Sequence, residues 1–195
     1  MATIDFAQLS IADTVTSGKG KSANISYVVA GAPVYWRPGG LQVAFEPGSF
    51  GGERSQGCSQ PQPATRVNMQ FRASAIQDTL DKLDTWIVEY VKQNVIRILG
   101  KDMTVGEVHN RYQPCLKRSE KYEPTFKVKV NMEGPNQVRL WDTSKQARSS
   151  PTAWKGLTVT PRLRLKGLWL MGRDFGALWE ATDLMFDDEP PECPF

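Results

Sequence analysis

Residues 152–186, TAWKGLTVTPRLRLKGLWLMGRDFGALWEATDLMF, carry the clearest structural pattern in this chain of 195 residues. In the run 162–166 (RLRLK), leucine alternates with arginine and lysine, a period of two that is typical of a β-strand with one buried and one solvent-facing side. The glycines at both ends of residues 172–176 indicate a turn, and residues 177–186 then read as a closing strand. The stretch therefore predicts two neighbouring strands that expose basic side chains on one face.

The same alternation recurs twice upstream. Residues 126–130 (FKVKV) place lysines between apolar residues, and residues 138–141 (VRLW) alternate in the same manner. Between residues 126 and 173 the chain holds ten basic residues against the two acids Glu133 and Asp142. Such a bias predicts binding of a polyanion, but it does not by itself select a fold.

The N-terminal part of the chain reads as short strands separated by glycine and proline. The expected strands are residues 25–30, 34–37, 41–45 and 67–71. Residues 46–66 are polar and rich in glycine and proline, so they predict a long exposed loop. Loops of this kind often bind ligands when they lie on a compact scaffold.

One long helix is expected at about residues 74–99. Ser74 with Gln77 matches the capping-box pattern at its start, and Gly100 is a natural C-terminal stop. Apolar residues recur along it at helical spacing, which indicates a helix that packs against a sheet or the end of a barrel. Its acids are expected mainly on the other side: Asp78, Asp81, Asp84 and Glu89. Residues 101–125 are expected to be loop-like.

These elements predict a mainly β fold with one long α-helix, arranged as an OB-fold-like Greek-key barrel. The length suits one globular domain with a sizeable core. We expect residues 1–182 to form this domain and residues 183–195 to form an acidic, flexible C-terminal tail.

A basic strand face suits a sugar-phosphate backbone. Contacts of Lys and Arg with phosphates release counterions, which gives a salt slope of about −0.7 per neutralised phosphate for single strands. Bases of a single strand can also stack on aromatic rings for roughly 1–3 kcal/mol each, whereas duplex bases are not available for stacking. The residues predicted on or near this face are Tyr35, Arg37, Lys127, Lys129, Arg139, Trp141, Arg162, Arg164 and Lys166.

The other tryptophans are assigned from the usual behaviour of this residue in β domains. Trp86, Trp169 and Trp179 are expected to fill the core. Trp36 and Trp154 suit either the core or the binding face.

Residues 183–195 hold five acids and no base, although the whole chain has 24 Lys plus Arg and 21 Asp plus Glu. The terminal run MFDDEPPECPF ends in an aromatic residue with a free carboxylate. This combination predicts a hook in which the ring fills a pocket on a partner while the carboxylates meet basic residues. The alternative is an acidic C-terminus without a partner. The hook residues are Asp187, Asp188, Glu189, Glu192, Pro194 and Phe195.

The tract YQPCLKRSEKYEPTFKVKV (residues 112–130), followed by residues 152–186, resembles the OB-fold single-stranded DNA-binding proteins of large eukaryotic DNA viruses. The shared motifs are a basic loop before a Tyr-x-Pro-Thr strand and a closing hairpin with the order Trp, Gly, Phe-Gly, Trp. The tail resembles the acidic, phenylalanine-ended tail of short-tailed phage DNA-binding proteins and the acidic tip of the bacterial single-stranded DNA-binding proteins. The tail of this chain differs in that Pro190-Pro191 and Cys193 interrupt its acidic run.

This resemblance implies a viral protein that binds single-stranded DNA without sequence specificity and acts in DNA replication, recombination and repair. It also implies that the tail recruits replication proteins, namely polymerase and helicase or primase, with Phe195 as the hook. The tail would fold back into the DNA groove in the absence of DNA, and a homodimer with exchanged tails follows by analogy. The DNA contacts that the resemblance implies are Lys117, Arg118, Lys121, Lys127 and Lys129.

Composition argues against several other classes. The cysteines Cys58, Cys115 and Cys193 form no CxxC pair, and His109 is the single histidine, so we expect no metal site, no cofactor and no catalytic residues. No run approaches the roughly 20 apolar residues of a membrane span. The N-terminus lacks a secretion signal, which favours an intracellular protein of the host cytoplasm or nucleus.

Two other classes stay open. A nucleic-acid-processing enzyme would need a metal site, for which Asp142 and Asp174 are the candidates beside basic strands. A structural or scaffolding virion β-protein would use the basic strands only to neutralise packaged nucleic acid. Preference for single over double strands separates this last class from a single-strand binder.

Overall fold

The computed structural model describes residues 4–17, 20–29, 31–49 and 66–187. Most of the expected loop at residues 46–66 lies outside these ranges, as do Cys58 and Cys193. Of the hook residues only Asp187 is described; Asp188, Glu189, Glu192, Pro194 and Phe195 lie outside the described residues.

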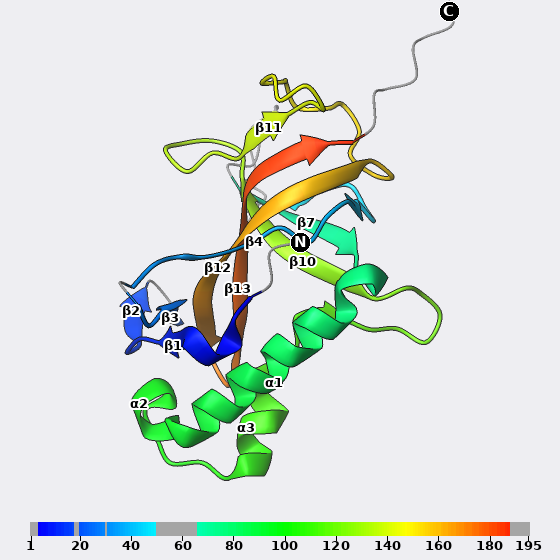
Figure 1. The fold of residues 1–195 in the computed structure, drawn as a ribbon. Coiled ribbons are helices and arrows are strands. Elements are labelled where there is room, and N and C mark those ends of the chain that lie inside the picture. Colours follow the sequence, from blue (N-terminus) through cyan, green and yellow to red (C-terminus); the bar gives the residue numbers. More distant parts are fainter. Residues whose placement is uncertain (1–3, 18–19, 30, 50–65, 188–195) are drawn as a thin grey trace, which may run out of the picture.

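Two long antiparallel strands form the centre of the molecule (Figure 1). Strands β12 (Thr158–Met171) and β13 (Asp174–Phe186) are joined by a tight turn at Gly172, whose φ is +60°. The predicted hairpin is confirmed, but the turn is shorter than the expected residues 172–176, because β13 already begins at Asp174. Residues 183–186, which were assigned to the tail, belong to β13.

The hairpin contains two register shifts, between Arg162 and Leu163 and between Leu165 and Gly167. At Gly167 the neighbouring strand comes very close, since a Cβ atom built there would lie 2.0 Å from the carbonyl oxygen of Ala23. Only glycine fits such an approach. The irregularity shifts the alternation of side chains, so Leu165 and Leu168 are both buried.

The remaining strands extend the sheet on both sides of the hairpin, in the order β1-β3-β12-β13-β10-β7-β6. Neighbours pair antiparallel except for β10 with β13, which is parallel. Six more short strands pair with this path. The bounds are β1 Leu9–Ile11, β2 Val15–Ser17, β3 Gly20–Tyr27, β4 Val34–Trp36, β5 Leu41–Gln42, β6 Gly48–Ser49, β7 Arg66–Arg72, β8 Tyr112–Gln113, β9 Leu116–Lys117, β10 Thr125–Asn131 and β11 Arg139–Trp141.

The ladders do not close into a complete barrel. Strand β5 pairs with β12, and the next residue, Val43, forms a single bridge to Phe71 of β7. The backbone N–H of Ala44 donates to the carbonyl of Gln70 at 2.8 Å. The mainly β fold with one long helix is therefore confirmed, and in the part of the chain that the structure describes this short contact joins β12 to β7 across the open side.

The helices gather at the end of the hairpin that carries its turn, away from β11 (Figure 1). A 3-10 turn (Ser74–Ile76) leads into α1 (Gln77–Gln93), which is followed by α2 (Val95–Leu99). The expected single helix is interrupted at Asn94, whose side chain donates to the carbonyl of Tyr90 at 2.9 Å. The expected stop is confirmed, since Gly100 has the left-handed φ of +75°.

Two local predictions about this region were wrong. The N-caps of the 3-10 turn and of α1 make no side-chain hydrogen bond, so Ser74 and Gln77 form no capping box. The capping box lies instead at Thr104 and Glu107, at the start of α3 (Val105–Arg111). Residues 101–125, which were expected to form a loop, thus contain a helix and two short strands. A capped helix with one half-buried face can be built from few residues, so such a short helix was missed.

The core lies between the sheet and α1. Trp36 (4 % exposed), Trp154 (7 %) and Trp179 (2 %) are buried, whereas Trp86 and Trp169 are only partly buried. The expectation of a core position is therefore confirmed for Trp179. Trp86 packs against the core from a partly buried position, and Trp169 does not belong to the core. Among the described helices, none combines the length and apolarity that crossing a membrane requires.

Candidate nucleic-acid interface

The central strands turn one set of side chains into the core and the other set outward. Leu163 on β12 and Val128 on β10 are fully buried. The outward set on β4, β7, β10, β11, β12 and β13 forms what we call the outer face. It consists of Tyr35, Arg37, Arg66, Asn68, Gln70, Lys127, Lys129, Arg139, Trp141, Thr160, Arg162, Arg164, Lys166, Glu180, Asp183 and Met185.

One row of paired residues crosses this face from strand to strand. Tyr35 of β4 pairs with Arg164 of β12, which pairs with Glu180 of β13. Glu180 in turn pairs with Lys129 of β10, whose partner on β7 is Asn68. Directly paired residues lie side by side on one face of a sheet. Side chains that are up to 145 positions apart in sequence (35 and 180) therefore form one surface.

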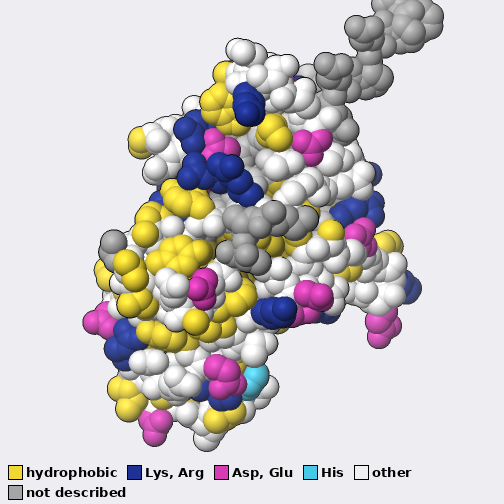
Figure 2. All heavy atoms as spheres, in the orientation of Figure 1, with side chains coloured by type: hydrophobic (Ala, Val, Ile, Leu, Met, Phe, Trp, Pro, Cys, Tyr) yellow, Lys and Arg dark blue, Asp and Glu magenta, His cyan; other side chains and the backbone are white. Residues whose placement is uncertain are grey.

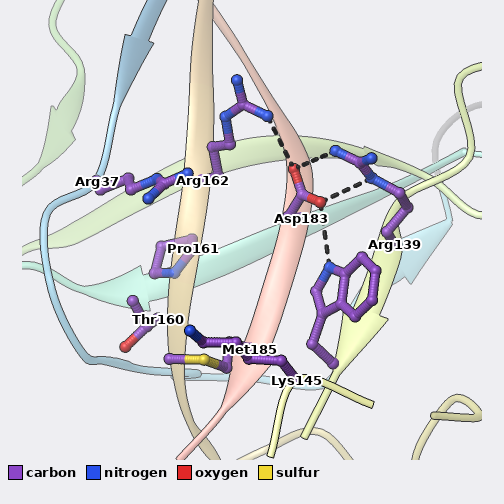
Figure 3. Close-up of a pocket in the computed structure, with 9 residues that line it drawn as sticks. Arg37, Arg139, Lys145, Thr160, Pro161, Arg162, Asp183 and Met185 are labelled. Atoms are coloured by element: carbon purple, nitrogen blue, oxygen red, sulfur yellow. Dashed lines mark hydrogen bonds and ion pairs between the residues drawn. The ribbon is translucent and has the colours of Figure 1, made fainter. Parts of the chain in front are cut away.

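A pocket of about 370 Å³ lies at one end of the outer face, around the carboxylate of Asp183 (Figure 3). Arg139 forms a two-pronged ion pair with it: Nε lies 2.7 Å from Oδ1, and Nη2 donates to Oδ2 at 3.0 Å. The indole Nε1 of Trp141 donates to Oδ1 at 3.1 Å, and Nη1 of Arg162 lies 3.7 Å from Oδ2. The other lining residues are Arg37, Lys145, Thr160, Pro161 and Met185.

Asp183 is held in its charged form. Partial burial raises the pKa of Asp183, but the hydrogen bonds from Arg139, Thr182 and Trp141 lower it by more. The pKa of Asp183 therefore lies below its usual value. The carboxylate thereby occupies a place between two guanidinium groups that also suits a phosphate oxygen. In Figure 2 basic side chains surround an acidic one near β11 and the adjoining parts of β12 and β13.

Aromatic rings lie beside the cations of this face. The guanidinium carbon of Arg162 is 4.1 Å from the centre of the Tyr35 ring, and that of Arg139 is 6.0 Å from the centre of the Trp141 ring. Both rings are partly buried, so their positions are fixed by the sheet. The pairs place a stacking surface next to a phosphate-binding group.

Lys129 lies at the crowded middle of the outer face. Partial burial lowers its pKa, as does repulsion from Arg66 and Lys166, while Glu180 acts in the opposite direction. Lys166 Nζ lies 3.9 Å from Glu180, and Asn131 donates to the same carboxylate. Glu180 is thus shared by Lys129 and Lys166, so the local charge stays positive and favours the binding of a further anion.

The basic loop before β10 is divided by the structure. Lys117 pairs with Thr125 of β10 and lies at the edge of the outer face. Arg118 is directed to helix α1, where its guanidinium forms hydrogen bonds of 2.6 and 2.7 Å with Asp81. Lys121 is exposed in the turn that precedes β10. Of the three residues that the resemblance implied here, Lys117 alone lies beside other residues of the face.

Sequence reasoning missed several residues of this region, namely Arg66, Asn68, Gln70, Thr160, Glu180, Asp183 and Met185 of the outer face, and Trp169 near it. Arg66, assigned to the loop, begins β7 and pairs with Asn131. Trp169, assigned to the core, is partly buried and lies against Gly176, where a Cβ atom would be 3.0 Å from its indole. Simple alternation from Leu165 places residue 169 inward, but the irregularity before Gly167 reverses the phase. An isolated glycine within a strand pattern is the signal that could have shown this.

The first acid of the hook lies at the margin of the outer face. Asp187 accepts hydrogen bonds from Thr160 Oγ1 at 3.0 and 3.2 Å, and its backbone N–H donates to the carbonyl of Thr158 at 3.0 Å. Thr160 also lines the pocket around Asp183. The chain therefore leaves the sheet next to the cationic surface.

The carboxylates that were considered as magnesium ligands lie apart from each other in the fold. Asp142 follows β11 and accepts a hydrogen bond from the N–H of Gln146 at 2.8 Å. Asp174 begins β13 at the far end of the hairpin. Within the described ranges, no three His, Cys, Asp or Glu side chains are grouped so that they could hold a metal ion.

Comparison with known proteins gives matches among solved structures. No family model and no curated protein matches the chain. The single-stranded DNA-binding protein of bacteriophage Enc34 in complex with single-stranded DNA is 12% identical, with a TM-score of 0.48, over 93% of this chain and 98% of that chain. A second structure of the single-stranded DNA-binding protein of this phage is 10% identical, with a TM-score of 0.45, over 95% of this chain and 96% of that chain. Its C-terminal truncation is 10% identical, with a TM-score of 0.45, over 93% and 98%.

Proposed function

We propose that this chain binds single-stranded DNA without sequence specificity, through the outer face. The observation that carries the proposal is the pairing of cations with aromatic rings on one continuous strand surface, above all Arg162 with Tyr35 at 4.1 Å. The basic side chains of this face outnumber its two acids, Glu180 and Asp183. They are Arg37, Arg66, Lys127, Lys129, Arg139, Arg162, Arg164 and Lys166.

Each half of this arrangement has a separate role. The cations neutralise backbone phosphates and release condensed counterions, which makes binding steeply dependent on salt. The rings of Tyr35 and Trp141 offer stacking surfaces that every base can use, so affinity does not require a particular sequence. A duplex keeps its bases stacked inside, so it would bind only through the cations of this face and not through the rings.

Asp183 has a place in this mechanism. Its carboxylate aligns Arg139 and Arg162 before DNA arrives, and an incoming phosphate shares or takes over these guanidinium groups. Such pre-alignment lowers the conformational entropy that the two arginine side chains lose on binding. The negative charge of Asp183 at the same time repels the phosphate.

The biological role that we propose is coating of single strands during DNA replication, recombination and repair, inside the host cell. We further propose that the acidic tail recruits replication proteins (polymerase, helicase or primase) and competes with DNA for the outer face. The position of Asp187 beside Thr160 supports this competition, because the tail starts at the margin of the cationic surface. A homodimer with exchanged tails belongs to the same proposal. No catalytic role, metal or cofactor is part of it.

A second candidate is a structural virion protein that neutralises nucleic acid of either form. It accounts for the cations but gives no role to the rings of Tyr35 and Trp141 beside them. The test is a titration of the intrinsic tryptophan fluorescence with oligo-dT at several salt concentrations, in competition with duplex DNA. Quenching that duplex DNA reverses only at large excess is the expected result. Equal competition by duplex DNA would favour the structural role, and absence of binding to either would overturn both.

A further inference from the structure

A gap in the sheet lies next to the outer face. Strand β13 pairs with β8 at Phe175 and Gly176, and with β10 at Glu180 and Ala181. Residues 177–179 between these positions pair with β12 on one side and have no strand partner among the described residues on the other. A pocket of about 630 Å³ opens there, between β13 and the strands β9 and β10. This volume lies within the range of sites for small organic ligands, roughly 300–1,000 Å³.

Aromatic side chains form much of this pocket. Trp169, on the outward side of β12, is partly buried and held against the backbone of Gly176. Trp179 and Phe126 lie deeper, with ring centres 5.6 Å apart and their planes nearly perpendicular. A planar ligand can therefore enter beside an indole face whose position the sheet already fixes.

The indole of Trp179 belongs to the inner wall of the pocket. Its Nε1 is buried and has no nitrogen or oxygen partner among the described residues. The thiol of Cys115 is its neighbour and acts as a weak acceptor. Trp179 is therefore a fixed part of the wall behind Trp169.

The wall on the opposite side is rigid, and the entrance is basic. Asp84 of α1 accepts hydrogen bonds from the hydroxyl of Tyr112 at 2.6 Å and from the N–H of Cys115 at 3.0 Å, which fixes the segment that leads into β9. Lys117 and Lys127, both exposed, line the entrance together with one exposed acid, Asp174. A flat aromatic wall beside two lysines matches one nucleotide: the base and its phosphate.

We propose that this pocket takes a single nucleobase of the strand that lies on the outer face. The base stacks on Trp169, and Lys117 and Lys127 hold the adjoining phosphates. Every base has a π-face that can stack on an indole, so the pocket anchors the strand without selecting a sequence. The inference rests on the proposed binding of single-stranded DNA. It adds one defined position at which a base of the strand is anchored.

The test compares two ligands of equal charge: oligo-dT and an abasic oligomer of the same length. The variant Trp169→Ala removes the stacking wall, and Trp86→Ala, at a partly buried tryptophan of α1, is the matched control. We expect Trp169→Ala to lose roughly 5- to 150-fold affinity for oligo-dT and to keep its affinity for the abasic oligomer, with an unchanged salt slope. Trp86→Ala should bind both like the wild type.

A second measurement needs no variant. Oligo-dT that carries 5-iodouracil is irradiated on the wild-type protein, and the attached peptide is identified by mass spectrometry. We expect attachment within residues 112–117 or 169–179. Attachment only elsewhere, or an equal loss of both ligands in Trp169→Ala, would overturn the pocket while leaving the proposed function intact. Failure of the wild type to bind either oligomer would instead refute the proposed function.

Discussion

The guanidinium of Arg162 lies over the ring of Tyr35, 4.1 Å from its centre, although the two residues come from opposite halves of the chain. The same guanidinium reaches Asp183, 3.7 Å away. A cation that is fixed between a ring and a carboxylate loses little conformational freedom when a phosphate arrives. The outer face thus holds both parts of a single-strand site in place before any ligand binds.

Reversing a charge in the middle of the outer face should weaken binding electrostatically. For Arg164→Glu or Lys129→Glu we expect lower affinity for oligo-dT and a salt slope reduced by about 0.7 for each lost phosphate contact. Fluorescence titration at several salt concentrations measures both quantities. Lys82→Glu, at an exposed position of α1, is the control and should leave the slope unchanged. An unchanged slope in both outer-face variants would remove this face as the binding site.

Removing a ring should weaken binding in a different manner. For Tyr35→Leu we expect roughly a 5- to 150-fold loss of affinity for oligo-dT without a change in the salt slope, because stacking involves no counterion. Tyr35→Phe keeps the ring and should bind like the wild type. The same titration measures both variants. A slope change in Tyr35→Leu of the size seen for Arg164→Glu would show that the ring acts only by positioning Arg162.

Asp183 should contribute to stability in a pH-dependent manner. Its pKa in the folded protein is held below the ordinary value of 3.8, so its charged form stabilises the fold. That stabilisation is fully present above the unfolded-state pKa and is lost as the pH falls through the lower folded-state pKa. We expect Asp183→Asn to be less stable than the wild type at neutral pH, with the difference shrinking below about pH 4. Urea unfolding at a series of pH values measures this, and a constant difference would contradict the assigned ion pair.

The same substitution should act on binding in the opposite direction. Without the carboxylate charge, Arg139 and Arg162 are free to pair with phosphate, so we expect Asp183→Asn to bind oligo-dT more tightly at low salt. Weaker binding would show that alignment of the two arginines outweighs the repulsion of DNA by Asp183.

Removal of the tail tests whether it competes for the outer face. A chain that ends after Asp187 should bind oligo-dT as tightly as the full chain or more tightly, since it lacks the three acids Asp188, Glu189 and Glu192, which we propose compete with DNA for the outer face. It should also lose capture of replication proteins in a pull-down assay. Reduced DNA affinity of the shortened chain would refute the competition, whereas an intact pull-down would refute the hook.

The amino-acid pattern predicted the central strands and most of the outer face, because alternation reports directly which side of a strand is buried. Lys127, Lys129, Arg162 and Arg164 lie outward as expected, between buried neighbours such as Leu163. Alternation carries no information on which strands become neighbours, so the row from Tyr35 to Lys129 needed the structure. Simple alternation also fails beyond an irregularity in a strand, so it could not have corrected the core position that Trp169 was given from the usual behaviour of tryptophan in β domains.

Short helices and local breaks in a helix were the second kind of feature that the sequence did not predict. Helix α3 spans Val105–Arg111, about two turns, too few for a hydrophobic period to stand out. The break at Asn94 depends on a side-chain bond to the carbonyl of Tyr90, which competes with the helix and is not encoded by apolar spacing. Ion pairs such as Arg118 with Asp81 join residues far apart in the chain, and charge alone does not reveal them.

The missing side chain at Gly167 has an effect beyond the sheet in which it lies. Even a methyl group there would collide with Ala23, and any relief of that collision would alter the phase of the residues that follow. The orientation of the indole at position 169 is thus set by a residue that touches no ligand. A substitution of Gly167 would therefore change ligand binding even if every residue that contacts the ligand stayed the same.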